Sequence, residues 1–206
     1  MAVPTRPRPA TPWALAIERP SGGSTAGWGM ALFIATEAML FASLFASYYY
    51  LRFKSSRVWP LGGIEPPDLT RAWIMTAIIV PSSLPMAWAV AAVQRGRRGA
   101  AGLGVGLTLL LGAGFVAVQC LELASDAAKF SPTANAYASI FYAIETLDAL
   151  HVVVGVLMLG FVLAALSLGR LGPARRRRTR VIGMYWHFVN VMWVFVLMVL
   201  HVSPHV

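Results

Sequence analysis

The chain has 206 residues, of which 58% are hydrophobic and only 12% are charged, whereas soluble domains carry about 25% charged residues. This composition excludes an ordinary soluble domain and indicates an integral membrane protein. The net charge of +9 comes from short basic blocks between apolar runs, which favours membrane topology over nucleic-acid binding as its cause, so no nucleic-acid partner is expected.

The first 26 residues are rich in Pro, Gly, Ser and Thr and have no apolar periodicity. Their longest apolar piece, residues 13–17, is too short for the hydrophobic region of a signal peptide. We therefore expect residues 1–26 to form a disordered N-terminal arm, followed by a transmembrane domain over residues 27–206.

Five apolar windows follow the arm, and each can cross about 30 Å of hydrocarbon at about 1.5 Å per residue. The windows lack the alternating ten-residue pattern of membrane barrels, so they predict helices. The expected fold is an all-α integral membrane protein, a bundle of five transmembrane helices. The helices are expected at about 28–51, 71–94, 100–124, 136–168 and 180–202.

Lysine and arginine divide unevenly between the two ends of this bundle: five lie on one side and twelve on the other. The positive-inside rule makes the richer side cytoplasmic, which predicts a cytoplasmic N-terminus and an external C-terminus. The twelve are Arg6, Arg8, Arg19, Arg95, Arg97, Arg98, Arg170, Arg175, Arg176, Arg177, Arg178 and Arg180.

Two local patterns concern helix packing. Pro81 and Pro85, in VPSSLP, predict a bend in the second span, with the hydroxyl groups of Ser82 and Ser83 available to the freed carbonyls. Small residues four apart predict close contacts between helices. These pairs are Ala42 with Ala46, Ser43 with Ser47, and Gly102 with Gly106.

Four of the eight acidic residues fall inside the predicted spans: Glu37, Glu122, Glu145 and Asp148. A charge at the centre of the bilayer costs about 3 kcal/mol even on insertion scales, so each is by default a functional hypothesis. Beside an apolar partner these acids should be protonated or hydrogen-bonded. Glu37 is interpreted as a protonated hydrogen-bond anchor on a face covered by protein or by lipid headgroups.

Glu145, Asp148 and His151 are three residues apart, so they cover about 120° of one helix face and form a polar stripe. The stripe is open to three interpretations: a metal site of the Glu-x-x-His kind, a proton relay, or a structural network buried against other helices. The network is preferred, because a closed metal site needs ligands on a second helix. Only His187 and the isolated Glu37 and Glu122 are available for that.

Two further groups of polar residues are candidates for packing or for the membrane interface. Gln119 and Glu122 share a face near the external end of the third span, where Glu122 either reaches the headgroups or is buried. The fifth span carries aromatic and polar residues near its cytoplasmic start, interpreted as a packing network in the interfacial belt. These are Trp186, His187, Asn190 and Trp193.

His201 and His205 are interpreted as an incidental exposed pair on the C-terminal tail, with metal binding by the pair left open. A further hypothesis joins Glu145, Asp148 and His151 with the face of the fifth helix that carries His187 and Asn190.

Motifs in all five spans, in order, resemble subunit III of the haem-copper terminal oxidases, the cytochrome c oxidase family. The first span carries the family's Ser/Thr-Glu pair as Thr36-Glu37. PSSLPMAWA, GFVAVQCLEL and YASIFYAIETLDALHVVVG resemble the next three helices. The most specific match is YWHFVNVMW, from Tyr185 to Trp193. The chain resembles the short, five-helix form.

Two departures leave the branch of the family open. Where the family usually has Thr-Gly-Phe-His-Gly-Leu-His, this chain has two acids, Glu145 and Asp148, in place of the Thr and the first His. Asn190 stands where the family usually has an aspartate. A cytochrome c oxidase, a quinol oxidase and an accessory subunit of nitric oxide reductase type all remain possible.

The resemblance implies a multi-pass subunit of a bacterial cytoplasmic membrane complex, without catalytic residues, metal or cofactor of its own. Haem and copper belong to its partner, the catalytic subunit I, which it would accompany with subunit II. It would stabilise that partner, support proton uptake and bind phospholipid. The alternatives from other classes are a small proton-coupled transporter, which should show two similar halves, and a membrane metalloenzyme.

Overall fold

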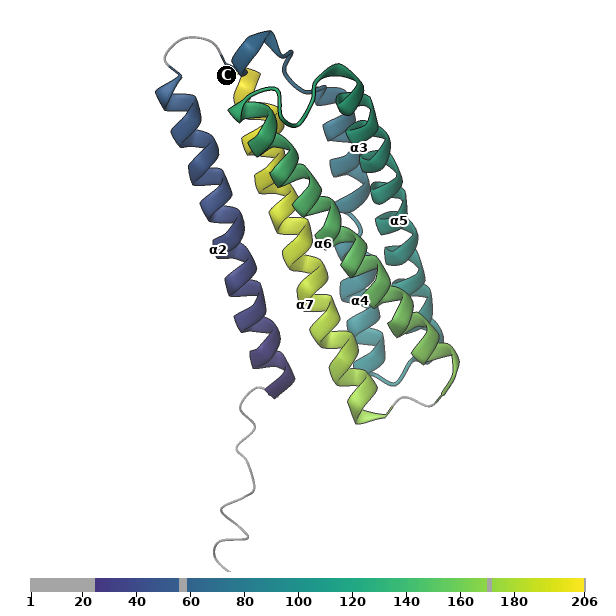
Figure 1. Cartoon of the computed structure of the whole chain (residues 1–206). Helices are drawn as coiled ribbons and strands as arrows, with labels where there is room; N and C mark the ends of the chain where they lie inside the picture. Colours follow the sequence, from purple (N-terminus) through teal and green to yellow (C-terminus); the bar gives the residue numbers. More distant parts are fainter. Residues whose placement is uncertain (1–24, 56–58, 170–171, 206) are drawn as a thin grey trace, which may run out of the picture.

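The computed structural model describes residues 25–55, 59–169 and 172–205, and these are almost entirely helical (Figure 1). Five helical segments are long and apolar enough to cross a membrane, which confirms the predicted all-α bundle. The arm predicted over residues 1–26 lies outside the described residues, except that Thr25 and Ala26 begin the first helix. The elements are α2 (Thr25–Lys54), η1 (Leu61–Gly63), α3 (Leu69–Ile79), α4 (Ser83–Gln94), α5 (Arg98–Lys129), α6 (Ala136–Ser167), α7 (Pro173–Val196), η2 (Leu197–Val202) and η3 (Ser203–His205).

Four of the five spans are longer than the apolar windows that predicted them, and α6 ends one residue before its window does. The helix α5 continues to Lys129, and α7 begins at Pro173 instead of near residue 180. Proline is favoured at the first position of a helix, because the N–H that it lacks would have no partner there. The arginines after Pro173 therefore lie on helical turns and not in a loop.

Two arginine side chains at this end of the bundle, one on α5 and one on α7, close the ends of neighbouring helices. Arg98 donates from Nε and Nη2 to the carbonyls of Leu166 and Ser167, each at 2.5 Å, at the end of α6. Arg176 on α7 donates to the carbonyl of Gln94, at the end of α4, at 3.4 Å. The last carbonyls of a helix have no partner within it, so the arginine-rich end stabilises the bundle as well as carrying charge.

The second span is interrupted between α3 and α4, as Pro81 predicts. The hydroxyl of Ser82 donates at 2.5 Å to the carbonyl of Ile79, which also accepts from the backbone N–H of Ser82 at 3.1 Å in the turn between the two helices. Pro85 does not add a second break, because it falls in the first turn of α4, where backbone N–H groups lack partners in any case.

In Figure 1, α2 runs along one side of the bundle, beside α6 and α7. It buries only Phe41 and Tyr48 completely. At its far end the hydroxyl of Ser203 accepts from Arg52 Nη1 at 2.7 Å and lies 3.4 Å from the hydroxyl of Tyr48. Most of the apolar surface of α2 is therefore left for lipid or for another protein.

Trp186 on α7 is the centre of the tightest packing. A Cβ atom at Gly155 on α6 would lie 2.9 Å from its ring, and Gly112 on α5 also faces it too closely for a side chain. The indole N–H donates to the hydroxyl of Ser82 at 2.9 Å. Three helices thus meet at one buried tryptophan because two of them carry glycine there.

The small-residue pairs predicted as contact sites are not the contact sites within this chain. Nothing lies within 4 Å of a Cβ atom at Gly102 or Gly106, and the pairs on α2 are exposed. The close approach between α4 and α5 occurs at Gly104, against the backbone oxygen of Pro85. The spacing identifies a helix face lined with small side chains, but it does not show whether another helix packs against that face.

Candidate functional site

Glu37 on α2 is paired with His151 on α6, with 3.0 Å between Oε2 and Nε2. The other ring nitrogen, Nδ1, lies 2.7 Å from the carbonyl oxygen of Leu147. A carbonyl can only accept, so Nδ1 carries a hydrogen. The bond to Glu37 then holds one proton, which belongs either to the carboxyl or to an imidazolium, and the pair is neutral overall in both cases.

Packing fixes the position of this histidine. The ring of Phe41 meets the imidazole edge-on at 5.2 Å between centroids. The hydroxyl of Tyr185 on α7 donates to the backbone carbonyl of His151 at 3.0 Å. Glu37 thus has the polar neighbour that an anchor requires, while its protonation remains a prediction.

Glu145 and Asp148 face a different helix. Gln119 on α5 lies with its Nε2 atom 3.3 Å from Glu145 Oε2 and 3.4 Å from both Asp148 Oδ2 and the carbonyl of Glu145. On the other side, Nε2 of His201 is 3.6 Å from Glu145 Oε1. Asp148 is wholly buried.

The stripe from Glu145 to His151 is therefore divided among three neighbouring elements. Glu145 and Asp148 contact α5, Glu145 also contacts η2, and His151 contacts α2. Residues six apart on a helix point about 120° away from each other, which is enough to bring them against different partners. The pairing of His151 with Glu37 could not be read from the spacing within one helix.

Glu122 is buried, with 8% of its surface exposed, so the interfacial interpretation is wrong for the chain alone. The helix continues past it, and Asp126 takes the outer position, where it pairs with Lys129 at 2.9 Å. Gln119, Glu122 and Asp126 are spaced three and four apart and share one face of α5.

The residues expected to form one packing network on α7 do so only in part. Trp193 donates to the hydroxyl of Thr76 at 3.0 Å, and Asn190 donates to the carbonyl of Trp186 on its own helix at 2.8 Å. His187 is half-buried and, with Asn190, lines a cavity of about 550 Å³ beside Pro81.

The hypothesis that His187 and Asn190 join the acidic stripe stays a prediction, although no hydrogen bond or ion pair among the described residues links them to it. These side chains lie on the part of α7 that faces the break between α3 and α4. The groups that reach the polar residues of α6 from the C-terminal segment are Tyr185 and His201.

His201 is also not the exposed tail residue that the sequence predicts. It is 1% exposed, because the π-helical turn η2 continues α7 within the bundle and brings the imidazole against Glu145 of α6. His205 lies 3.2 Å from the carbonyl of Pro67, so the two histidines have different partners. Over residues 25–55, 59–169 and 172–205, no three His, Cys, Asp or Glu side chains are grouped to hold a metal ion.

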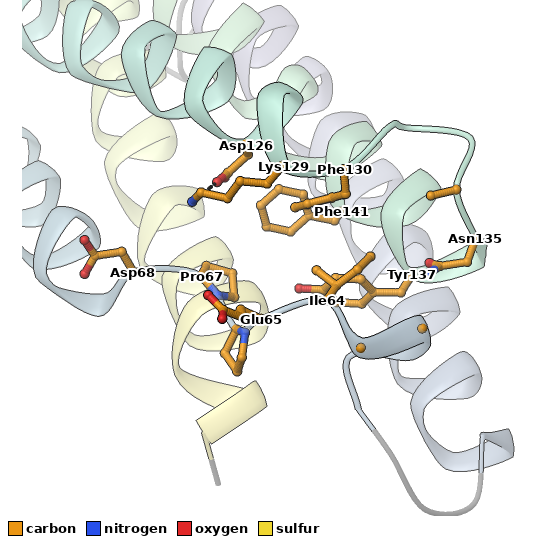
Figure 2. A pocket seen from close by; sticks show the side chains of 14 residues that line it. Ile64, Glu65, Pro67, Asp68, Asp126, Lys129, Phe130, Asn135, Tyr137 and Phe141 are labelled. Carbon is orange, nitrogen blue, oxygen red and sulfur yellow. Dashed lines mark hydrogen bonds and ion pairs between the residues drawn. The ribbon is translucent and has the colours of Figure 1, made fainter.

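A cavity of about 810 Å³ opens at the end of the bundle opposite the arginine-rich end (Figure 2). The loop from Gly62 to Asp68 forms one wall, and Asp126, Lys129 and Tyr137 belong to the other. Asp68 caps α3 by accepting from the backbone N–H of Thr70 at 2.8 Å, and this bond lowers the pKa of its carboxyl.

A family model described as cytochrome c oxidase subunit III matches residues 23–203. The chain belongs to this family. A probable cytochrome c oxidase subunit 3 of Nocardia farcinica is 33% identical, over 81% of this chain and 82% of that protein. The cytochrome c oxidase subunit 3 of Bacillus subtilis is 30% identical, over 94% of this chain and 91% of the relative.

A third relative comes from a different branch: a cytochrome bo(3) ubiquinol oxidase subunit 3 of Pseudomonas aeruginosa is 30% identical, over 88% of this chain and 86% of that protein. As a subunit III, the chain is an accessory subunit of a haem-copper oxidase, a multi-subunit membrane oxidoreductase. The family match favours this assignment over the transporter and metalloenzyme alternatives.

The two buried histidines of this subunit III are engaged by protein groups in the part of the chain that the structure describes. Both ring nitrogens of His151 are hydrogen-bonded, and His201 faces a carboxylate. What the described residues provide is a set of buried hydrogen-bonding and proton-binding groups.

Proposed function

We propose that this subunit III takes no direct part in oxygen reduction and packs against the catalytic subunit I of the oxidase, which holds haem and copper, beside subunit II. The observation that carries this proposal is the family match across all five spans. It is supported by the use of the buried histidines in hydrogen bonds and ion pairs. In this role the chain stabilises the catalytic subunit and supports its proton uptake.

The same proposal includes the bacterial cytoplasmic membrane, with the N-terminus inside and the C-terminus outside. The bacterial relatives support this location. The excess of Lys and Arg at the end that contains Arg97 and the start of α7 supports the orientation.

The proposed function also includes the binding of phospholipid. A groove of about 420 Å³ lies between the start of α2 and α7, where arginine side chains stand beside apolar ones. This combination suits an anionic headgroup with an acyl chain below it. The lining residues are Ala26, Ala174, Arg177, Arg178, Val181 and Ile182.

Cytochrome c is proposed as the electron donor of the complex, because the family description and two of the relatives named above are of cytochrome c oxidase. A quinol oxidase is the second candidate, supported by the relative named as a ubiquinol oxidase subunit.

The test is to purify the tagged chain in a mild detergent and record the reduced-minus-oxidised visible spectrum and the metal content. Haem and copper in a fixed ratio to a larger partner are expected, with oxygen consumption driven by reduced cytochrome c. Turnover with quinol alone would favour the second candidate. A colourless chain that purifies alone would overturn the proposal.

A further inference from the structure

A file of buried polar side chains runs from the cavity of Figure 2 into the interior of the bundle. On α5 it consists of Asp126, Glu122 and Gln119, which are between 2% and 8% exposed. On α6 it continues with Glu145, which is 6% exposed, and ends at the wholly buried Asp148. The two sets face each other, since Gln119 contacts both carboxyl groups of α6.

The outer end of this file is open to the cavity. Asp126 belongs to the wall, and Figure 2 shows its ion pair with Lys129 there. Tyr137 of α6 lines the same space. One water molecule needs about 30 Å³, so a volume of about 810 Å³ is ample for a hydrated vestibule.

The inner end has fewer hydrogen-bond donors than acceptors. Gln119 has two amide hydrogens for three acceptors. Asp148 Oδ1, Glu145 Oε1 and Gln119 Oε1 are buried and make no hydrogen bond among the described residues, and Nε2 of His201 approaches Glu145 Oε1 only to 3.6 Å. The hydroxyl of Tyr137, nearer the cavity, is buried without a partner as well. Buried polar atoms in folded proteins are nearly always paired, so these atoms point to a ligand that supplies hydrogens.

We propose that Glu122, Glu145 and Asp148 form a proton-binding site within the membrane, filled through water from the cavity bounded by Gly62–Asp68. Each bound proton converts a carboxylate into a carboxylic acid, which supplies the donor that Gln119 cannot. The proton, and not a metal ion, is the ligand that these groups favour, because over the described residues no three metal-binding side chains converge.

Charged and titratable groups from every neighbouring element surround this site. The cavity at its outer end is lined by acidic residues and by Lys129. From the other side of the file, Tyr185 lies within electrostatic range of both Asp148 and Glu37. The groups are Glu65 and Asp68 of the loop before α3, Arg71 of α3, Asp126 and Lys129 of α5, Tyr137 of α6, Tyr185 of α7, His201 of η2, His205 of η3 and, through His151, Glu37 of α2.

The site is distinct from the Glu37–His151 pair and from the proposed role beside the catalytic subunit. It opens at the end opposite Arg97 and Arg98, and all its residues belong to this chain. The inference therefore does not depend on which oxidase the chain belongs to.

Infrared difference spectroscopy of the purified complex, titrated with pH in H₂O and in D₂O, tests the binding of protons. We expect the carbonyl-stretch band of protonated carboxylic acids to change with pH and to shift in D₂O. Asp148→Asn and Glu145→Gln should each remove part of this pH-dependent carboxylic-acid band. Glu37→Gln is the control and should leave those components unchanged. A band that is identical in the wild type and in both variants would overturn the proposal.

Access is tested by narrowing the cavity. Ala134→Trp places a large side chain at a residue of its lining. Ala127→Trp is the matched control on the outer face of α5, in another groove. We expect deuterium exchange of the carboxyl band to slow several-fold in Ala134→Trp alone. Equal exchange in both variants and the wild type would overturn entry from the cavity, and this comparison holds even if the Asp148 variant does not assemble.

Discussion

The residue that most needs a partner in the membrane is Glu37, and it has one in His151. Replacing it with leucine leaves Nε2 of the imidazole without a partner, which costs about 1–3 kcal/mol. Glu37→Gln keeps a donor and should be nearly neutral. We expect a lower midpoint of thermal unfolding for Glu37→Leu than for Glu37→Gln in the purified complex. Equal midpoints would show that the hydrogen bond does not stabilise the bundle.

Gly155 is a second residue whose identity is set by a single contact. In Gly155→Ala the new methyl group meets the ring of Trp186 at 2.9 Å, and such overpacking costs about 1–3 kcal/mol. Gly106→Ala, where nothing lies within 4 Å, should be neutral or slightly stabilising because alanine favours a helix. The comparison is by thermal unfolding. A Gly155→Ala protein as stable as Gly106→Ala would contradict the close packing.

At the scale of elements, one hydroxyl links the broken span to α7. Ser82 donates to the carbonyl of Ile79 and accepts from the indole of Trp186. Ser82→Ala leaves the buried indole N–H of Trp186 without an acceptor, whereas the carbonyl of Ile79 still accepts from the backbone N–H of residue 82, so we expect a loss of about 1–3 kcal/mol. Ser83→Ala, at the half-buried neighbouring position, is the control. If both variants unfold at the same temperature, the hydroxyl does not hold the two helices together.

The groove between α2 and α7 gives a prediction about lipid. Arg177 stands beside apolar side chains there, and a basic residue near the membrane surface contributes about 1 kcal/mol, or about fivefold, to the binding of an anionic lipid. Arg177→Gln should reduce the anionic phospholipid that purifies with the complex, as measured by mass spectrometry. Arg97→Gln, in the loop between α4 and α5, is the control and should retain the lipid.

For the whole molecule, the five helices were predictable because hydropathy is a sum over single residues, and the break at Pro81 follows from one missing N–H. The pairing of Glu37 with His151 was not predictable, because the two residues are 114 positions apart. Each helix alone shows only the spacing of its own residues. His201 was misjudged for a related reason: it lies within the fifth predicted span, but its contact with Glu145 of α6 cannot be inferred from that span alone. The acids within the predicted spans could thus be named from the sequence, whereas Asp126, which lies beyond the third predicted span, and the partners of these acids could not.

The orientation of the whole chain rests on charge alone and can be measured directly. Cys120 is the one cysteine of the sequence, so Cys120→Ala provides a background for single-cysteine variants. Ala134→Cys lies in the loop after α5, and Arg97→Cys lies at the opposite end, before α5. If the arginine-rich end is cytoplasmic, a membrane-impermeant maleimide should label the first on intact cells and the second only after permeabilisation. The reverse pattern would invert the topology and would place the mouth of the acidic file on the cytoplasmic side.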